Sequence, residues 1–330
     1  LIRKSDGLPV GAISGFCNML QRYVEVSRGS DAPTHLAVIF DKGSHTFRND
    51  LYDLYKANRE EMPQDLRPQI PLTREATRAF NIACHEIEGY EADDIIGTLA
   101  CEAREAGGRV TIISSDKDLM QLVGGGVEML DAMKNRRIDR EGVFEKFGVY
   151  PEQVVDVQAL AGDSVDNIPG APGIGIKTAA LLINEYGNLE NLLQDAHEIK
   201  QPKRRSAITE NAEQIRLSKK LVKLNCSTPL DFSLEDLEFR EPEPTKLFKF
   251  LKKMEFRTLT KRIADRLSMS VPGIMEVEDQ QNLNTIHKKP FNTNDYICIE
   301  DIKTLFVWIE KIKDRGYVAI DTETTSLDAM

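Results

Sequence analysis

The chain has 330 residues, of which 41% are hydrophobic and 29% charged, and its formal net charge is −10 at pH 7. This length allows about two domains and part of a third. Neither a run of apolar residues long enough to span a membrane nor the apolar core of a signal peptide is present, so we expect a cytoplasmic protein. Its five dispersed cysteines contain no Cys-x-x-Cys pair, which argues against a disulfide framework and a zinc site.

The first 41 residues predict a helix followed by a buried strand. Residues 11–27 carry apolar side chains at helical spacing, which indicates an amphipathic helix. Residues 35–40 form a short apolar run that ends at Asp41, as in a buried parallel strand. Asp41 would then stand at the carboxyl end of its strand, where ligands bind in open α/β sheets.

The same alternation continues toward residue 150. Helices are predicted for 73–83 and 91–106, and Gly107-Gly108 separates the second from a strand over 109–116. Asp116 ends this strand as Asp41 ends the earlier one. The pattern predicts that residues 1–150 form a doubly wound α/β domain, with a parallel sheet flanked by helices.

In the second half of the chain, the predicted elements change from alternating strands and helices to mostly helices. Residues 143–268 read as helices broken by Gly and Pro, and we assign 151–267 to a helical subdomain. Residues 268–295 are polar and aperiodic, as in a linker. A helix over 302–312 and a strand over 317–321 then suggest that 296–330 begin another domain.

Eight acids recur in four short groups. Taken alone, each group has an ordinary explanation as helix N-terminal acids or as a capping turn. Taken together they indicate a hard-metal site, because clustered carboxylates repel one another unless cations lie among them. The candidate ligands are Asp41, Glu91, Asp93, Asp94, Asp116, Asp118, Asp163 and Asp166.

All-oxygen ligation favours Mg²⁺ or Mn²⁺, and this many carboxylates fits two ions about 3.5–4 Å apart. Two such ions suit phosphodiester hydrolysis. The net charge of −10 argues against a nucleic-acid substrate at first sight. Bound divalent cations would reverse the local sign, so local basic groups matter more than the total charge.

A glycine-rich stretch follows the last acids. It does not fit a P-loop, because Ile176 intervenes between Gly175 and Lys177. It fits a helix-hairpin-helix, which presents backbone N–H groups to a DNA phosphate, although a simple turn joining two helices remains the alternative. The candidate DNA-binding residues of this stretch are Gly170, Gly173, Gly175, Lys177 and Thr178.

A group of basic and aromatic residues precedes the helix predicted over 91–106. Tyr55, Lys56 and Arg59 fall within one helical turn, with Arg48 nearby. Such a group can pair with phosphate and stack on an unpaired base. On its own, such a group is more often a solvated helix face.

In combination these motifs resemble the 5′-nuclease region of bacterial DNA polymerases I. The resemblance covers about residues 9–265 and is carried by Ala37–Asp41, Thr46–Arg48, Tyr55-Lys56 with Arg59, Glu91–Asp94, Asp116–Asp118 and Gly162–Thr178. It implies a PIN/flap-endonuclease-like fold and a flap endonuclease and 5′-to-3′ exonuclease, which removes RNA primers and displaced strands in replication and repair. The matching acids would hold the metals. Lys56 and Arg59 would lie on a helical arch and act on the reacting phosphate.

The ends of the chain add two expectations. Residues 317–324 resemble the first strand of a ribonuclease H-like 3′-to-5′ exonuclease domain, with Asp321 and Glu323 as a partial metal site. The family begins with a strand ending in Val-Asp-Gly-Ser, whose Asp is a metal ligand, and this chain starts after that point. For this piece taken alone, the resemblance therefore implies that one ligand is absent and that the site is impaired.

Three functions remain open at this point. The first is a structure-selective nuclease that acts, as a monomer and away from membranes, on DNA with 5′ flaps, nicks or RNA primers. The second is a catalytically impaired module that holds branched DNA. The third is an RNA-cleaving nuclease, which would share the acids without requiring the hairpin.

Overall fold

The computed structural model describes residues 1–28, 32–267 and 298–315. The chain divides into two compact units, Leu1–Ser270 and Val271–Met330. The predicted strand over 317–321, with Asp321 and Glu323, lies outside the described residues, as does the predicted linker 268–295. In the part of the chain that the structure describes, no helix is both long enough and apolar enough to cross a membrane.

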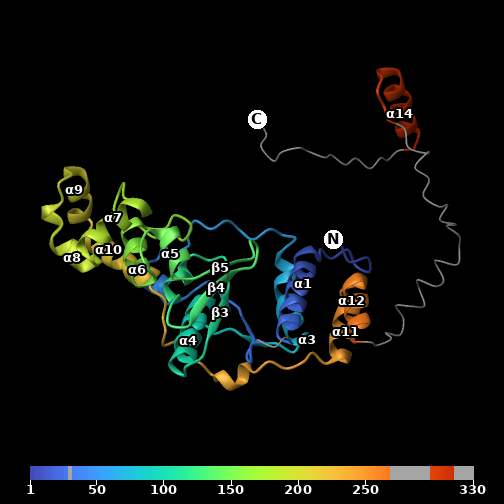
Figure 1. The fold of residues 1–330 in the computed structure, drawn as a ribbon, viewed down its shortest axis with the longest axis horizontal. Coiled ribbons are helices and arrows are strands. Elements are labelled where there is room, and N and C mark those ends of the chain that lie inside the picture. Colours follow the sequence, from blue (N-terminus) through green and yellow to red (C-terminus); the bar gives the residue numbers. More distant parts are fainter. Residues whose placement is uncertain (29–31, 268–297, 316–330) are drawn as a thin grey trace. The chain divides into compact units, whose positions relative to one another are not determined.

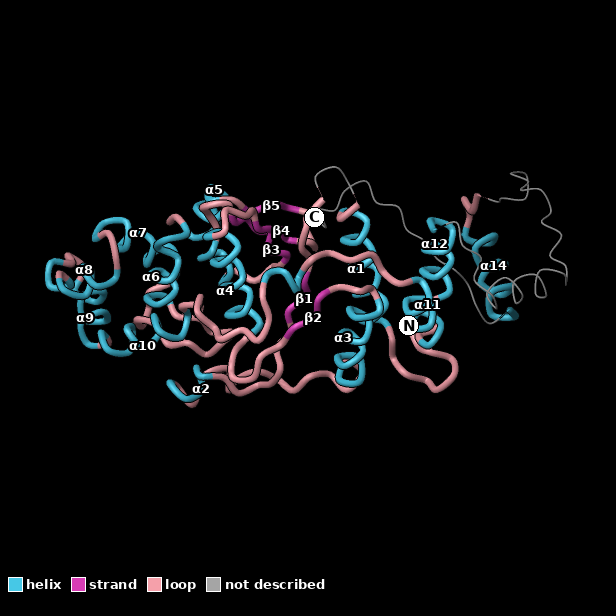
Figure 2. The backbone as a smooth tube through the Cα atoms, turned by 90° about the horizontal axis from the view of Figure 1, so that it is seen from below, coloured by secondary structure: helices cyan, strands magenta, loops and turns pink. Residues whose placement is uncertain are grey.

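The strands of the first unit form two small sheets (Figure 2). In one, β1 (Ala37–Ile39) runs parallel to β2 (Ala83–His85). In the other, β3 (Val110–Ile113) runs parallel to β4 (Val127–Asp131), which pairs antiparallel with β5 (Arg136–Ile138). The predicted α/β fold with parallel strands and flanking helices is confirmed. The described strands nevertheless form two sheets rather than one, because no backbone ladder joins the β1–β2 pair to β3–β5, and β5 is antiparallel. The sequence also missed β2, whose three residues are too few to show a period.

Helical residues outnumber strand residues in the part of the chain that the structure describes (Figure 1). Those of the first unit are α1 (Gly11–Val26), α2 (Phe47–Leu51), α3 (Ile70–Ala79), α4 (Ala92–Glu105), α5 (Arg140–Phe147), α6 (Pro151–Ala161), α7 (Ile176–Tyr186), α8 (Leu189–Gln194), α9 (Pro202–Glu210), α10 (Ala212–Val222), α11 (Pro244–Lys253) and α12 (Arg257–Leu267). The described helix of the second unit is α14 (Ile302–Arg315). The helices predicted over 11–27, 91–106 and 302–312 are thereby confirmed. The helix predicted over 73–83 begins three residues earlier and ends at Ala79.

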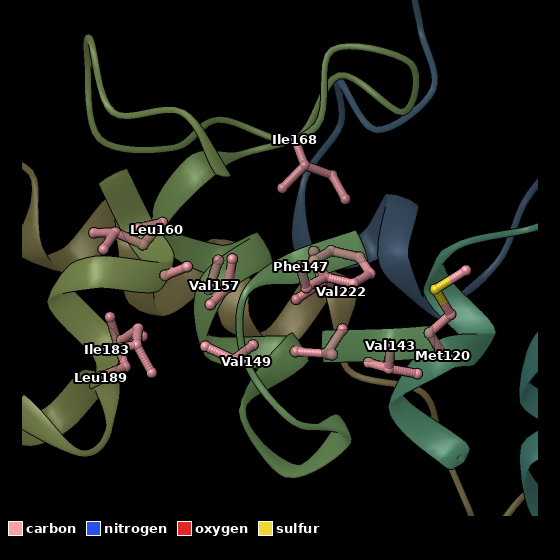
Figure 3. Packing of buried hydrophobic residues seen from close by; sticks show 14 of the residues in the cluster. Met120, Val143, Phe147, Val149, Val157, Leu160, Ile168, Ile183, Leu189 and Val222 are labelled. Atoms are coloured by element: carbon pink, nitrogen blue, oxygen red, sulfur yellow. The ribbon is translucent and has the colours of Figure 1, made fainter. Parts of the chain in front are cut away.

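Separate apolar clusters hold the first unit together. One cluster packs α1 and α3 against α11 and α12, and it includes Ile13, Phe80 and Leu251. A larger cluster joins β3–β5 to the helices α5–α10. Figure 3 shows side chains of this larger cluster from α5, α6 and α7, among them Phe147, Leu160 and Ile183. β1 and β2 lie between α3 and α4 (Figure 2).

Gly170 lies where two backbone segments meet. A Cβ atom built on Gly170 would come within 2.4 Å of the Ala161 carbonyl carbon and of the Gly162 nitrogen. Both are main-chain atoms, which cannot move aside as a flexible side chain can. Gly162 has a φ of +72°, and a Cβ there would lie 2.6 Å from the Gly170 nitrogen. The loop between α6 and α7 therefore depends on a glycine at both positions.

We expect Gly170→Ala to lower the free energy of unfolding by about 1–3 kcal/mol or more, as overpacking does. Urea denaturation would measure it. Gly175→Ala is the matched control, because nothing lies within 4 Å of a Cβ at Gly175 and its φ is −95°. Equal stability of the two variants would contradict the close approach at Gly170.

Candidate functional site

The first group of acids gathers at the amino-terminal end of α4. Glu91 is the N-cap residue of this helix, and Asp41, which follows β1, accepts a hydrogen bond from the Ala92 backbone N–H at 2.8 Å. Burial raises the pKa of Asp93 to about 7, and the negative charges of Asp116, Glu91 and Asp41 add to the effect. These acids therefore lie close enough for their charges to repel.

A second group surrounds Asp116, which follows β3. Burial and the charge of Asp116 raise the pKa of Asp118 to about 6, and Asp163 adds to the rise. A hydrogen bond that the Gln158 amide donates to Asp118 acts in the opposite direction. Asp116 thus belongs to both groups, and its own carboxylate accepts a hydrogen bond from the Asp118 backbone N–H at 3.0 Å.

Three basic side chains neutralise part of this acidic site. Lys56 lies 2.5 Å from Glu91 and 3.6 Å from Asp166. Arg59 pairs with Asp166 at 2.7 Å. On the other side, Lys117 pairs with Asp163 at 2.6 Å. The acids without an ion-pair partner among the described residues are Asp41, Asp93, Asp116 and Asp118.

The donor chemistry fits a hard divalent cation, since every candidate ligand is a carboxylate and their mutual repulsion needs positive charge. The positions of these carboxylates fit a bound cation less well. Among the residues that the structure describes, no three His, Cys, Asp or Glu side chains are grouped so that they could hold one ion together. Internal basic side chains instead balance several of the acids.

Arg48 and Asp94 do not belong to the solvent-facing site. Their side chains are 1% and 0% exposed, and two hydrogen bonds of 2.6 and 2.8 Å join the guanidinium to both carboxylate oxygens. Arg48 also donates to the Leu221 carbonyl oxygen at 2.8 Å. The prediction that Arg48 contacts DNA is therefore wrong for this structure. The predicted ligand Asp94 is likewise occupied, because Arg48 already engages both of its oxygens.

The segment around Lys56 also differs from the prediction. Residues 53–58 form turns rather than a helical arch, and Lys56 itself has a φ of +58°. Its backbone N–H donates to the Asp166 carbonyl oxygen at 2.9 Å, so the segment is attached to the loop that carries Asp163 and Asp166. Tyr55 is 4% exposed and donates its hydroxyl to Glu91. A buried ring cannot stack on a base, which corrects the role predicted for Tyr55.

The glycine-rich stretch joins α6 to α7 and is only partly available to a ligand. Gly173 and Gly175 are exposed, with Gly173 at a φ of +75°, and nothing would contact a Cβ at either position. Lys177 is exposed in the first turn of α7, and Thr178 is half-buried beside it. Gly170 is used instead for backbone packing. A phosphate at the amino-terminal end of α7 could thus meet all of the predicted residues except Gly170.

Sequence reasoning missed two residues that shape the acidic site. Lys117 neutralises Asp163, and the Gln158 amide holds Asp118. Lys117 could have been found, because it stands between two acids that were themselves assigned to the site. Gln158 gives no such signal, since it lies inside α6 in a sequence pattern that reads as ordinary helix.

Comparison with known families agrees with this architecture. Residues 1–148 match the model of the 5′-3′ exonuclease N-terminal resolvase-like domain, and residues 149–245 match the 5′-3′ exonuclease C-terminal SAM fold. The T5 5′-exonuclease structure with divalent metal ions (zinc) bound has a similar fold, with a TM-score of 0.58 and 23% identity. The match covers 75% of this chain and 91% of the T5 chain.

Among curated proteins, DNA polymerase I of Rhizobium leguminosarum is 46% identical and matches 100% of this chain, which spans 38% of that polymerase. The 5′-3′ exonuclease of Aquifex aeolicus is 38% identical, over 78% of this chain and 87% of the relative. The chain is thus about as long as the exonuclease and spans little more than a third of the polymerase. By both comparisons it belongs to the 5′-3′ exonuclease family, as a relative of DNA polymerase I.

Proposed function

We propose that the chain is the structure-selective 5′-to-3′ exonuclease and flap endonuclease part of a DNA polymerase I. Its substrates would be DNA with 5′ flaps, nicks or RNA primers in replication and repair, cleaved by a cytoplasmic, monomeric protein. The observation that carries this proposal is that Asp116 belongs to two neighbouring acid groups, with Lys56 and Arg59 at their edge. Such an arrangement suits hydrolysis of a phosphodiester.

We propose two Mg²⁺ or Mn²⁺ ions as the cofactors of this site. Asp41, Asp93, Asp116 and Asp118 would hold them first, because they have no ion-pair partner among the described residues. Glu91, Asp163 and Asp166 would join once their basic partners turn to the substrate. Bound divalent ions would supply a nucleophilic hydroxide and neutralise charge on the scissile phosphate. The related T5 flap endonuclease has been solved in complex with DNA and metal ions, which supports this assignment.

The chain's own residues would position the DNA. Lys56 and Arg59 now face Glu91 and Asp166, and a phosphate arriving there would offer them a competing anion. The exposed amino-terminal end of α7, with Gly173, Gly175, Lys177 and Thr178, would bind the duplex backbone through N–H groups and charge. Contacts of this kind fix the position of the DNA without reading its sequence.

The domain assignments belong to the same proposal. Residues 1–150 would be the catalytic domain, 151–267 the DNA-binding subdomain, 268–295 a linker and 296–330 the start of a 3′-to-5′ exonuclease domain. Asp321 and Glu323 would be a partial site of that last domain.

The alternative is a catalytically impaired module that holds branched DNA. It is favoured by one observation: no three candidate ligands are grouped to hold an ion in the part of the chain that the structure describes. In that case the acids would remain paired with Lys56, Arg59 and Lys117. DNA binding at α7 would be unaffected.

One experiment separates the two functions. The chain is incubated with a 5′-labelled flap DNA in Mg²⁺, in Mn²⁺ and in EDTA, and binding of the same DNA is measured in parallel. We expect cleavage near the junction with either metal and none in EDTA. Tight binding with an intact flap in both metals would overturn the nuclease assignment and support the binding module. Loss of both activities would contradict both.

A further inference from the structure

Two cysteines from distant parts of the sequence lie close together. Cys101 is in α4, and Cys226 follows the end of α10. The Cys101 thiol is close enough to contribute to a raised pKa of Cys226. A Cβ built on Gly97, one helical turn before Cys101, would lie 3.7 Å from Cys226 Sγ. Cys226 therefore packs directly on the face of α4 that carries Cys101.

The backbone around the pair is already fixed. Thr98 accepts a hydrogen bond from the Thr228 backbone N–H at 3.0 Å and donates to the Asn225 carbonyl oxygen at 3.1 Å. The Asn225 backbone N–H donates to Asp94 at 2.9 Å. These bonds hold the segment 223–228 against α4 on both sides of Cys226. The two segments that carry the cysteines are thus already joined next to the pair.

The two thiols have different surroundings. Arg104 donates a hydrogen bond to Cys101 Sγ at 3.7 Å. Burial and the neighbouring Cys101 raise the pKa of Cys226 to about 12. Both side chains are half-buried rather than enclosed, so a small oxidant can approach. Because its pKa is raised, we assign Cys226 to the second step and Cys101 to the first.

We propose that Cys101 and Cys226 form a redox modification site, where a peroxide converts the two thiols into a disulfide that ties α4 to the segment 223–228. The Cys101 thiolate attacks a peroxide oxygen, and with hydrogen peroxide this gives a sulfenic acid and one water after proton transfer. Cys226 loses its proton and attacks the Cys101 sulfur, releasing the second water. Two electrons leave the thiols and reduce one peroxide, and a reducing thiol reverses the change.

The disulfide has a measurable physical consequence. It would close a loop of about 125 residues in the unfolded chain, which removes conformational entropy from that state. Hydrogen bonds of Thr98 and Asn225 already hold the two segments together, so the disulfide would add to existing contacts. Oxidation should therefore raise the thermal unfolding temperature. The start of α4, with Glu91 and Asp93, belongs to the helix that is tied.

The test uses the full chain with Cys298→Ser, which removes an exposed thiol and leaves four of the five cysteines. After brief treatment with hydrogen peroxide, the thiols titrated in denaturant are expected to fall from four to two. Peptide mapping should show Cys101 linked to Cys226, and the unfolding temperature should rise until a reductant is added.

Three further variants, made in the same background, serve as controls. Cys101→Ser and Cys226→Ser should each lose the linked peptide and the temperature rise, while Cys84→Ser should keep both. Four thiols remaining after oxidation, or a linkage to any other cysteine, would overturn the proposal. A linked peptide without a rise in unfolding temperature would contradict the proposed stabilisation.

Discussion

Replacement of Arg48 by alanine is expected to lower the free energy of unfolding by about 3–5 kcal/mol, the cost of leaving one charge of a buried ion pair alone. Arg48 joins three parts of the first unit, because it lies in α2, binds Asp94 of α4 and donates to the backbone at the end of α10. Without the guanidinium, the fully buried Asp94 carboxylate would lose its charged partner. Urea denaturation measures the change.

Two comparisons make this prediction specific. Arg136→Ala breaks an ion pair with Glu145 whose side chains are 57% and 68% exposed, so its stability should hardly change. Arg48→Met combined with Asp94→Leu removes both charges and should recover part of the lost stability, since no buried charge is left unpaired. If Arg48→Ala unfolds like Arg136→Ala, the pair is not buried as described. If it stays folded but loses affinity for flap DNA, the DNA-contact role would be restored.

Replacement of Asp116 by asparagine is expected to slow cleavage of a 5′-flap DNA by roughly a thousandfold, the scale at which loss of one electrostatic group acts in catalysis. Asp116 contributes charge to both acid groups, so its loss should weaken both. Asparagine keeps a side-chain oxygen for the Asp118 backbone N–H, which preserves the turn. Single-turnover cleavage in Mg²⁺ gives the rate.

The same variant has a second readout that does not depend on activity. Removing one of several repelling carboxylates should leave stability in metal-free buffer unchanged or higher at neutral pH. Affinity for the flap DNA should stay within a few fold, because the end of α7 is untouched. Asp265→Asn, at an exposed position in α12, is the control and should cleave normally. Wild-type cleavage by Asp116→Asn would remove this residue from the site.

Different features of the chain were predictable to different degrees. Long periodic segments such as α1, α4 and α14 were found from the sequence, because the repeat of a buried helix face is a local property. The positions of Asp41 and Asp116 after β1 and β3 were also found, since a short apolar run that ends in an acid marks a strand end. The split of the strands into two sheets was not, because strand pairing depends on residues far apart in sequence.

For charged residues too, the sequence does not show which distant residues they contact. Arg48, Lys56 and Arg59 carry the same charge and lie close together in the sequence, yet Arg48 is buried against Asp94 while Arg59 remains on the surface. The sequence gives the chemistry of such side chains but not their exposure. Whether a cation meets DNA or a buried carboxylate is decided by what folds around it.

By itself the sequence determined the family, the main helices and the carboxylate chemistry of the site, because residue types and local spacing carry that information. Only the tertiary structure decided which acids remain available. It paired Asp94 with Arg48, placed Lys56 and Arg59 on Glu91 and Asp166, and made Asp116 common to two acid groups. It also brought Cys101 and Cys226 together. The physical reason is that charge interactions and burial depend on distance in space, which sequence separation does not report.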